Sequence, residues 1–268
     1  MAGPAEAAGY AVERERGALI VALPSVMATV LSHIRDHGTL YDAAAATPGA
    51  ESFTGRGAAY RIHLSGEDCV VRHYRRGGAV ARILHDEYLR AGEPRPLREL
   101  HASIAARQRG VDTPEVLAAI VYLAGPLYRA DLATRFVPHS RDLAEVTFSA
   151  DAQWPAVKRV AAWGAAGRML RTTFDAGVRH PDLNLRNILV APETGNVPEH
   201  GEHAVRALLI DLDRASVGTA PIHPRERGEM LDRLHRSRRK LEGRAGLATS
   251  AAELSAFDGG LAGGGATQ

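Results

Sequence analysis

The chain has 268 residues, of which 45% are hydrophobic and 24% charged, so it can fold around a sizeable core. Its 33 basic and 31 acidic residues leave a formal net charge of +2, which argues against nucleic-acid binding driven by bulk charge. The single cysteine, Cys69, excludes an internal disulfide, and its apolar surroundings in the sequence predict a buried core residue.

Residues 1–50 are expected to form an N-terminal extension and linker. The apolar run at 18–31 is too short to cross a bilayer and contains Pro24. We therefore expect a strand or helix packed on the first lobe rather than a signal peptide. The alanine-rich residues 42–50 are typical of a linker.

Residues 51–138 begin with the pattern strand, glycine turn, strand, polar turn, strand, over 52–64 and 69–78. Gly55 and Gly57 lie in the first turn, where the absence of a Cβ would let the backbone approach phosphates closely. Taken alone, two glycines in a hairpin are weak evidence for a phosphate-binding loop.

Arg72 lies on the third of these strands, where a cation could contact the α- and β-phosphates of a nucleotide. A carboxylate on a following helix should pair with it. The amphipathic helix predicted at 97–108 offers Glu99, and Glu87 is the alternative. Two apolar runs at 116–124 and 128–137 predict a second antiparallel pair.

The most specific signal is HPDLNLRNILV, which begins at His180 and is followed after a polar loop by a second apolar run, LLIDLD. An acid, an amide and a second acid in this order suit phosphoryl transfer. Asp182 would be the catalytic base, and Asn187 and Asp211 would ligate Mg²⁺. His180 would have a structural role in holding the loop.

The motifs HxDLNxxNIL and IDxDR resemble those of the lipopolysaccharide core kinases, within the protein-kinase-like superfamily. RHYRRGG and YRADL narrow the resemblance to the 3-deoxy-D-manno-octulosonic acid (Kdo) kinase group, over residues 53 to 241. It implies an α+β, bilobal protein-kinase-like fold. Residues 51–138 would form an antiparallel β-sheet N-lobe with one main helix, and 139–243 a mostly helical C-lobe. The Ala/Gly-rich residues 244–268 are expected to be a disordered tail.

The resemblance also implies ATP and Mg²⁺ as cofactors, and transfer of the γ-phosphate to the 4-hydroxyl of Kdo on lipid A. Such an enzyme works at the cytoplasmic face of the inner membrane. Arg75 and Arg76 would bind the anionic acceptor, because guanidinium groups suit carboxylate and phosphate. A basic helix predicted at 225–244 could contact anionic lipid. The sequence does not determine the oligomeric state.

Three positions depart from the usual kinase pattern. Arg72 replaces lysine, Pro181 stands in the catalytic loop, and Asp-Leu-Asp at 211–213 replaces Asp-Phe-Gly. Arg72 and Pro181 favour a nucleotide-binding pseudokinase without turnover as a competing interpretation. A heptose kinase and a Ser/Thr kinase would have the same fold and also compete. A Ser/Thr kinase is disfavoured because no APE-like segment follows Asp211.

Overall fold

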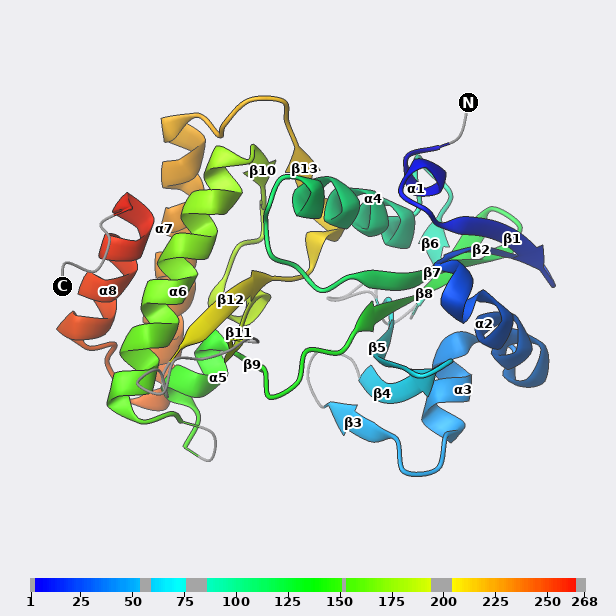
Figure 1. The fold of residues 1–268 in the computed structure, drawn as a ribbon, viewed down its shortest axis with the longest axis horizontal. Helices are drawn as coiled ribbons and strands as arrows, with labels where there is room; N and C mark the ends of the chain where they lie inside the picture. The colour runs from blue at the N-terminus through cyan, green and yellow to red at the C-terminus, as the bar shows by residue number, and fades with distance from the viewer. Residues whose placement is uncertain (1–2, 54–58, 76–85, 151–152, 194–203, 264–268) are drawn as a thin grey trace. The chain divides into compact units, whose positions relative to one another are not determined.

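A computed structural model describes residues 3–53, 59–75, 86–150, 153–193 and 204–263. The chain divides into two compact units (Figure 1). The first unit comprises Met1–Ile104 and Pro114–Phe136, and the second comprises Ala105–Thr113 and Val137–Gln268.

The first unit is built on an eight-stranded antiparallel sheet. The strand order is β1-β2-β7-β8-β5-β4-β3, and β6 pairs with β8. The expected three-stranded hairpin is present as β3, β4 and β5, and the expected second pair as β7 and β8. The bounds are β1 (Ala11–Glu15), β2 (Ala18–Ala22), β3 (Glu51–Phe53), β4 (Ala59–Leu64), β5 (Glu67–His73), β6 (Tyr88–Leu89), β7 (Val116–Ala124) and β8 (Leu127–Arg135).

Helices cover both faces of this sheet. Val30 of α2 joins a buried cluster with Ile120 of β7, whereas Leu100 of α4 joins a second cluster with Val121, the next residue of the same strand. Successive strand residues point to opposite faces, so β7 is apolar throughout rather than alternating. The helices of this unit are α1 (Pro4–Ala7), α2 (Pro24–His37), α3 (Leu40–Ala46) and α4 (Arg95–Gln108), the last of which extends into the second unit.

The N-terminal fifty residues are more structured than an extension and linker. The run at 18–31 forms β2 and the start of α2, which agrees with the expected strand or helix packed on the first lobe. Strand β2 pairs with β7, inside the sheet. The expected linker at 42–50 includes most of α3. Among the described residues of 51–138, α4 is the one helix, as expected. The first unit also contains α2, which has 14 residues, as many as α4, and packs on the sheet through Val26, Val30 and Ile34.

A buried carboxylate, Asp131, joins three elements of the first unit. It accepts hydrogen bonds from the Tyr122 hydroxyl (2.7 Å) and the Tyr41 backbone amide at the start of α3 (2.8 Å). Its other oxygen lies 2.5 Å from Nδ1 of His73, whose Nε2 lies 3.1 Å from Asp86. Burial lowers the pKa of His73, but hydrogen bonds and attraction from Asp131 and Asp86 outweigh burial and leave this pKa raised. A protonated ring can donate to both carboxylates.

The second unit is mostly helical, with α6 packed against β12 and α8. Two small antiparallel sheets accompany the helices, one in the order β12-β11-β9 and one formed by β10 and β13. The helices are α5 (Leu143–Phe148), α6 (Ala156–Asp175), α7 (Pro224–Ala245) and α8 (Ala251–Ala262); the strands are β9 (Arg141–Asp142), β10 (Val178–Arg179), β11 (Ile188–Pro192), β12 (Val205–Leu209) and β13 (Ser216–Val217). This agrees with an α+β chain, as expected.

The C-terminal segment differs from the disordered tail that we expected, because α8 is an ordered part of this unit. Phe257 is buried against Trp163 of α6, with ring centroids 5.8 Å apart. Ser250 and Glu253 form a capping box at the start of α8. The glycines have a packing role: a Cβ on Gly260 would collide with the carbonyl oxygen of Gly164. Small residues therefore allow α6 and α8 to approach backbone to backbone.

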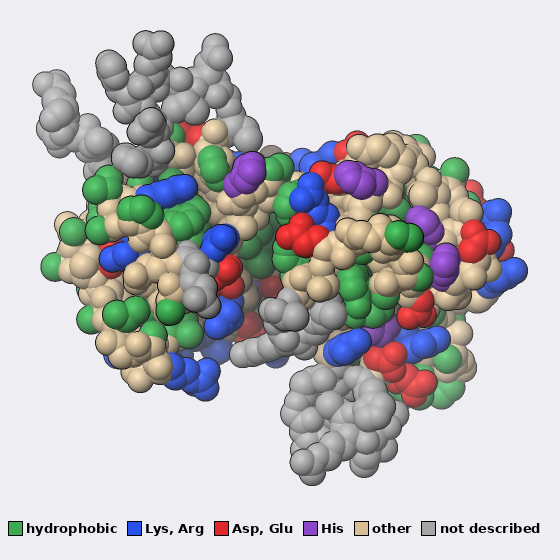
Figure 2. Space-filling model, turned by 90° about the horizontal axis from the view of Figure 1, so that it is seen from below, with side chains coloured by type: hydrophobic (Ala, Val, Ile, Leu, Met, Phe, Trp, Pro, Cys, Tyr) green, Lys and Arg blue, Asp and Glu red, His purple; other side chains and the backbone are tan. Residues whose placement is uncertain are grey.

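Charged side chains of both signs lie interspersed on the face shown in Figure 2. Among the described residues, no helix combines the length and apolar character needed to span a membrane. Cys69 is fully buried in the sheet core, and burial raises the pKa of its thiol to about 12, so the expected core role is confirmed.

The glycines of α8 offer a test of the close helix contact. Gly260→Ala should destabilise the protein by about 1–3 kcal/mol, because the added methyl group has no room. Gly259→Ala is the matched control: no atom lies within 4 Å of its added Cβ, and higher helix propensity should stabilise by up to about 1 kcal/mol. Denaturant unfolding measures both. Equal effects of the two substitutions would contradict the close contact.

The His73–Asp131 pair predicts a pH dependence of stability. Because the pKa of His73 is higher when folded, its contribution is fully present below the unfolded pKa, about 6.5, and is lost as pH rises through the folded pKa. The difference in unfolding free energy between wild type and His73→Gln should therefore be largest below about pH 6.5 and shrink as the pH rises above it. Denaturant titrations across this range measure it, and a pH-independent difference would contradict the ion pair.

Candidate active site

The two antiparallel strands β11 and β12 bring the predicted metal ligands to one end of a sheet. Their register pairs Ile188 with Leu209, so Asn187 and Ile210 lie opposite each other immediately beyond the pair. The Ile210 amide donates to the Asn187 carbonyl at 3.0 Å. Asp211 follows directly. The structure therefore brings Asn187 and Asp211 to the same end of the strand pair.

The loop before β11 is held by its own polar side chains. The backbone carbonyl of Asp182 accepts hydrogen bonds from the side-chain amides of Asn184 (2.8 Å) and Asn187 (3.2 Å). Asn187 is largely buried, which restrains the loop. These bonds place Asp182 beside Asn187, so all three residues of the predicted phosphoryl-transfer set meet in one unit.

His180 is buried, and its Nε2 lies 3.1 Å from the carbonyl oxygen of Ile210. Since a carbonyl only accepts, Nε2 carries the hydrogen in this contact. The ring thus ties the loop to the residue before Asp211, which is the structural arrangement that the sequence predicts for His180.

Pro181 fits this loop without losing a needed amide. The Leu183 amide donates to the His180 carbonyl at 3.3 Å, which closes a four-residue turn. Pro181 is the second residue of that turn, where proline's fixed φ is favoured and no backbone donor is required. The proline is therefore compatible with the loop conformation, and the case for a pseudokinase loses one of its two supports.

Asp211 has left-handed backbone angles, with φ 65° and ψ 54°. Such a conformation is uncommon outside glycine, although Asp and Asn tolerate it better than most residues. Strained backbone of this kind is often found at functional sites. The 3₁₀ turn that follows, Leu212–Arg214, contains the buried carboxylate Asp213.

Sequence reasoning missed two contributors in this unit. Arg214 donates from Nη1 to Oδ2 of Asp182 at 2.6 Å, so a cation lies directly on the predicted base. Its signal was present as the final residue of the IDxDR motif. Asp142 lies 3.6 Å from Arg186 of the loop and caps α5 through the Glu145 amide. Burial raises the pKa of Asp142.

The oxygen donors of Asn187 and Asp211 suit a Mg²⁺ ion that also binds phosphate and water, rather than a metal ion held entirely by protein ligands. Carboxylate and amide oxygens are the ligands that Mg²⁺ takes, and it often uses one or two protein groups with phosphates and water. Across the residues that the structure describes, no group of three or more His, Cys, Asp or Glu could hold a metal. Asn187 and Asp211 fit the first kind of site.

In the first unit, Arg72 of β5 forms an ion pair with Glu99 of α4. Glu99 is 4% exposed and also accepts a hydrogen bond from the Tyr74 hydroxyl at 2.5 Å. The expected pairing of Arg72 with Glu99 is thus present. A buried carboxylate shared by two donors holds the guanidinium in place.

Of the other four residues predicted to bind nucleotide or acceptor, the structure describes one. Gly55, Gly57 and Arg76 lie outside the described residues. Arg75 is exposed, and its guanidinium carbon lies 5.7 Å from the ring centroid of Tyr41.

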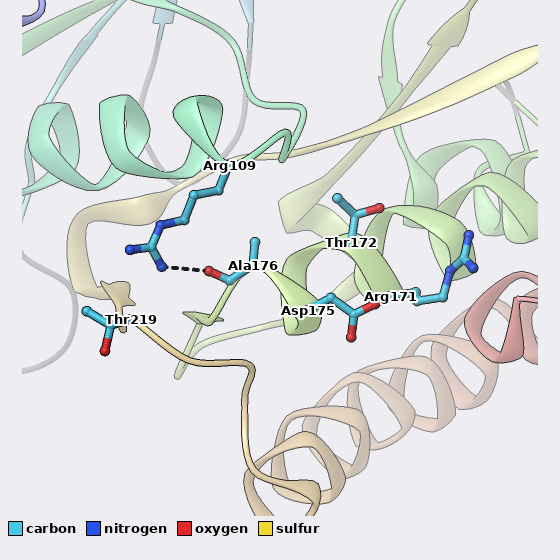
Figure 3. Close-up of a pocket in the computed structure, with 6 residues that line it drawn as sticks. All are labelled: Arg109, Arg171, Thr172, Asp175, Ala176 and Thr219. Atoms are coloured by element: carbon cyan, nitrogen blue, oxygen red, sulfur yellow. Dashed lines mark hydrogen bonds between the residues drawn. The ribbon is translucent and has the colours of Figure 1, made fainter.

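A pocket of about 620 Å³ opens at the end of α6 (Figure 3). Arg109 points toward Ala176 and donates to its carbonyl at 2.9 Å, and it also donates to the Gly218 carbonyl. Arg109 thereby satisfies the Ala176 carbonyl at the C-terminal end of α6 and ties it to the loop that follows β13. No predicted site residue lines this pocket; its lining is Arg109, Arg171, Thr172, Asp175, Ala176 and Thr219.

Comparison with known proteins gives consistent matches. Residues 47–256 match the model of the lipopolysaccharide kinase (Kdo/WaaP) family. A 3-deoxy-D-manno-octulosonic acid kinase of Vibrio cholerae is 35% identical over 52% of this chain and 57% of its own length. A kinase of the same name from Stenotrophomonas maltophilia is 36% identical over 70% of this chain and 69% of its own length.

A solved structure described as WaaP in complex with acyl carrier protein aligns with a TM-score of 0.49 and 20% identity, over 85% of each chain. The family match spans most of the chain and includes every predicted site residue. The family that the sequence motifs indicated is confirmed: the chain belongs to the lipopolysaccharide kinase (Kdo/WaaP) family.

Proposed function

We propose that this chain transfers the γ-phosphate of ATP to the 4-hydroxyl of Kdo in Kdo-lipid A. The observation that carries the proposal is the meeting of Asp182, Asn187 and Asp211 at one end of the β11–β12 pair. The relatives named as Kdo kinases support the choice of acceptor. A heptose in the same inner core is the competing acceptor within this family.

Asp182 is the base in this proposal. Its carboxylate is 43% exposed, so an acceptor hydroxyl can reach it. The carboxylate orients the hydroxyl and takes its proton as the bond to phosphorus forms. His180 and the two asparagine amides hold the backbone around Asp182, which limits the motion of the base.

Asn187 and Asp211 would hold Mg²⁺, which supplies positive charge against the triphosphate when bound. Arg72 would contact the α- and β-phosphates, with Glu99 fixing its orientation. Arginine can bridge phosphate and carboxylate through separate N–H groups, so the replacement of lysine is compatible with this role.

Exposed cations on α7 support peripheral contact with anionic lipid at the cytoplasmic face of the inner membrane. They recur at helical spacing, and none is paired with a carboxylate in the part of the chain that the structure describes. Each could contribute about 1 kcal/mol near an anionic surface. They are Arg233, Arg236, Arg239, Lys240 and Arg244.

The catalytic assignment predicts different defects for two carboxylates. Asp182→Ala should lower kcat by about 100- to 10,000-fold while Mg²⁺-ATP binding is retained, because the base acts on the acceptor. Asp211→Ala should also lose Mg²⁺-dependent nucleotide binding. Phosphorylation of Kdo-lipid A with mapping of the phosphate position, together with calorimetry of nucleotide binding, measures both.

The control for this experiment is Asp175→Ala, a carboxylate of the same unit whose surface ion pair with Arg227 contributes little. Unchanged turnover in the Asp182 variant would contradict the mechanism. Transfer by the wild type to a heptose but not to Kdo would show that heptose, rather than Kdo, is the acceptor sugar. Binding of ATP without transfer to either sugar would indicate a pseudokinase.

The lipid contact is tested by a variant of α7 in which Arg233, Arg236, Lys240 and Arg244 are replaced by Gln. Binding to vesicles containing phosphatidylglycerol should fall by more than about tenfold, because four cations are lost. Co-sedimentation measures it, with pure phosphatidylcholine vesicles as the reference. The charge-matched control replaces four exposed arginines outside α7, Arg14, Arg35, Arg129 and Arg141, and an equal loss there would contradict a specific surface.

A further inference from the structure

The ion pair between Arg214 and Asp182 is well formed but exposed. Its atoms are 2.6 Å apart, and the side chains are 60% and 43% exposed. A pair in contact with water contributes little to stability, about 0–1 kcal/mol. Stability therefore does not explain a guanidinium on the proposed base, and separating the pair costs little.

Arg214 has bonding capacity beyond this contact. A guanidinium carries five N–H donors, and the hydrogen bond of Arg214 to Asp182 is made by Nη1. The turn Leu212–Arg214 follows directly from Asp211, so the backbone that positions the metal ligand also positions Arg214. Its side chain reaches the base from the side of Asp211 rather than from the loop 180–187.

The loop itself does not supply an equivalent cation at the base. Asn184 is neutral, and its side chain is engaged by the Asp182 carbonyl and the Arg186 amide. Arg186 lies 3.6 Å from Asp142. Arg214 is thus the cation that the structure pairs with Asp182.

We propose that Arg214 binds an anionic group of the acceptor beside the hydroxyl that Asp182 activates. This inference rests on the proposed function, in which Arg72 and Mg²⁺ already meet the charge of the nucleotide. The acceptor is acidic, with a carboxylate on the attacked sugar and phosphates on lipid A. When the acceptor binds, the N–H groups of Arg214 turn to its oxyanion, while Asp182 takes the hydroxyl. Paired guanidinium and carboxylate thus recognise a hydroxyl and an anion together.

The test compares wild type, Arg214→Gln and Arg214→Lys on three acceptors: Kdo-lipid A, its Kdo methyl ester, and its dephosphorylated form. On the intact acceptor, Arg214→Gln should raise the acceptor KM by about 10- to 100-fold, as expected for a lost charged hydrogen bond, with the KM for ATP unchanged. Arg214→Lys should raise the acceptor KM by a smaller factor, because lysine keeps the positive charge. If Arg214 binds the carboxylate, the difference in acceptor KM between Arg214→Gln and wild type should vanish on the methyl ester. If Arg214 binds a phosphate, this difference should vanish on the dephosphorylated form.

Arg141→Gln is the matched control, since Arg141 is an exposed arginine of the same unit paired with Glu145. A fall in kcat that is equal on all three acceptors would overturn the proposal, because Arg214 would then act on the transferred phosphoryl group or only through Asp182. Unchanged kinetics in Arg214→Gln would also overturn it. Absence of transfer by the wild type would instead contradict the proposed function, so the two failures are distinguishable.

Discussion

The register of β11 and β12 positions the residues of the second unit on which the proposed phosphoryl transfer depends. The two strands pair so that Asn187 and Ile210 are opposite each other, and Asp211 follows at the same end. A slip of one residue would turn every side chain of a strand to the opposite face. The Ile210 carbonyl also accepts a hydrogen bond from Nε2 of His180. This bond connects the loop that carries Asp182 to the residue before Asp211. The proposed chemistry therefore depends first on the backbone pairing of these two strands.

In the first unit, the two stretches that narrowed the family resemblance meet inside the sheet. RHYRRGG contributes His73 and YRADL contributes Asp131, which lie side by side on β5 and β8. Asp131 also holds the start of α3, so the motif residues organise a helix that the sequence had suggested was a linker. A buried charge of this kind requires its partners, because an unpaired carboxylate in an apolar core is strongly destabilising.

Local patterns predicted the elements whose apolar spacing is strong, including α4, the β7–β8 pair and the strands β11 and β12 of the candidate site. The helix α8 could not be predicted from composition, because its glycines read as disorder when they in fact allow close packing on α6. The signal for it was the spacing of Ser250 and Glu253 before Phe257. The IDxDR motif contains Arg214, but the motif does not reveal that Arg214 pairs with Asp182, since this pairing depends on how the chain folds back.

Position 211 carries two demands at once. In the proposed function the side chain offers carboxylate oxygens to Mg²⁺, and in the structure the backbone occupies the left-handed region. Glycine meets the second demand without the first, and glutamate meets the first but lacks the short side chain that eases the second. Two independent requirements leave aspartate, with asparagine as a poorer substitute, so a change that preserves charge here is not conservative. The backbone conformation at position 211 thus limits which residue types the site can use, independently of any bound ligand.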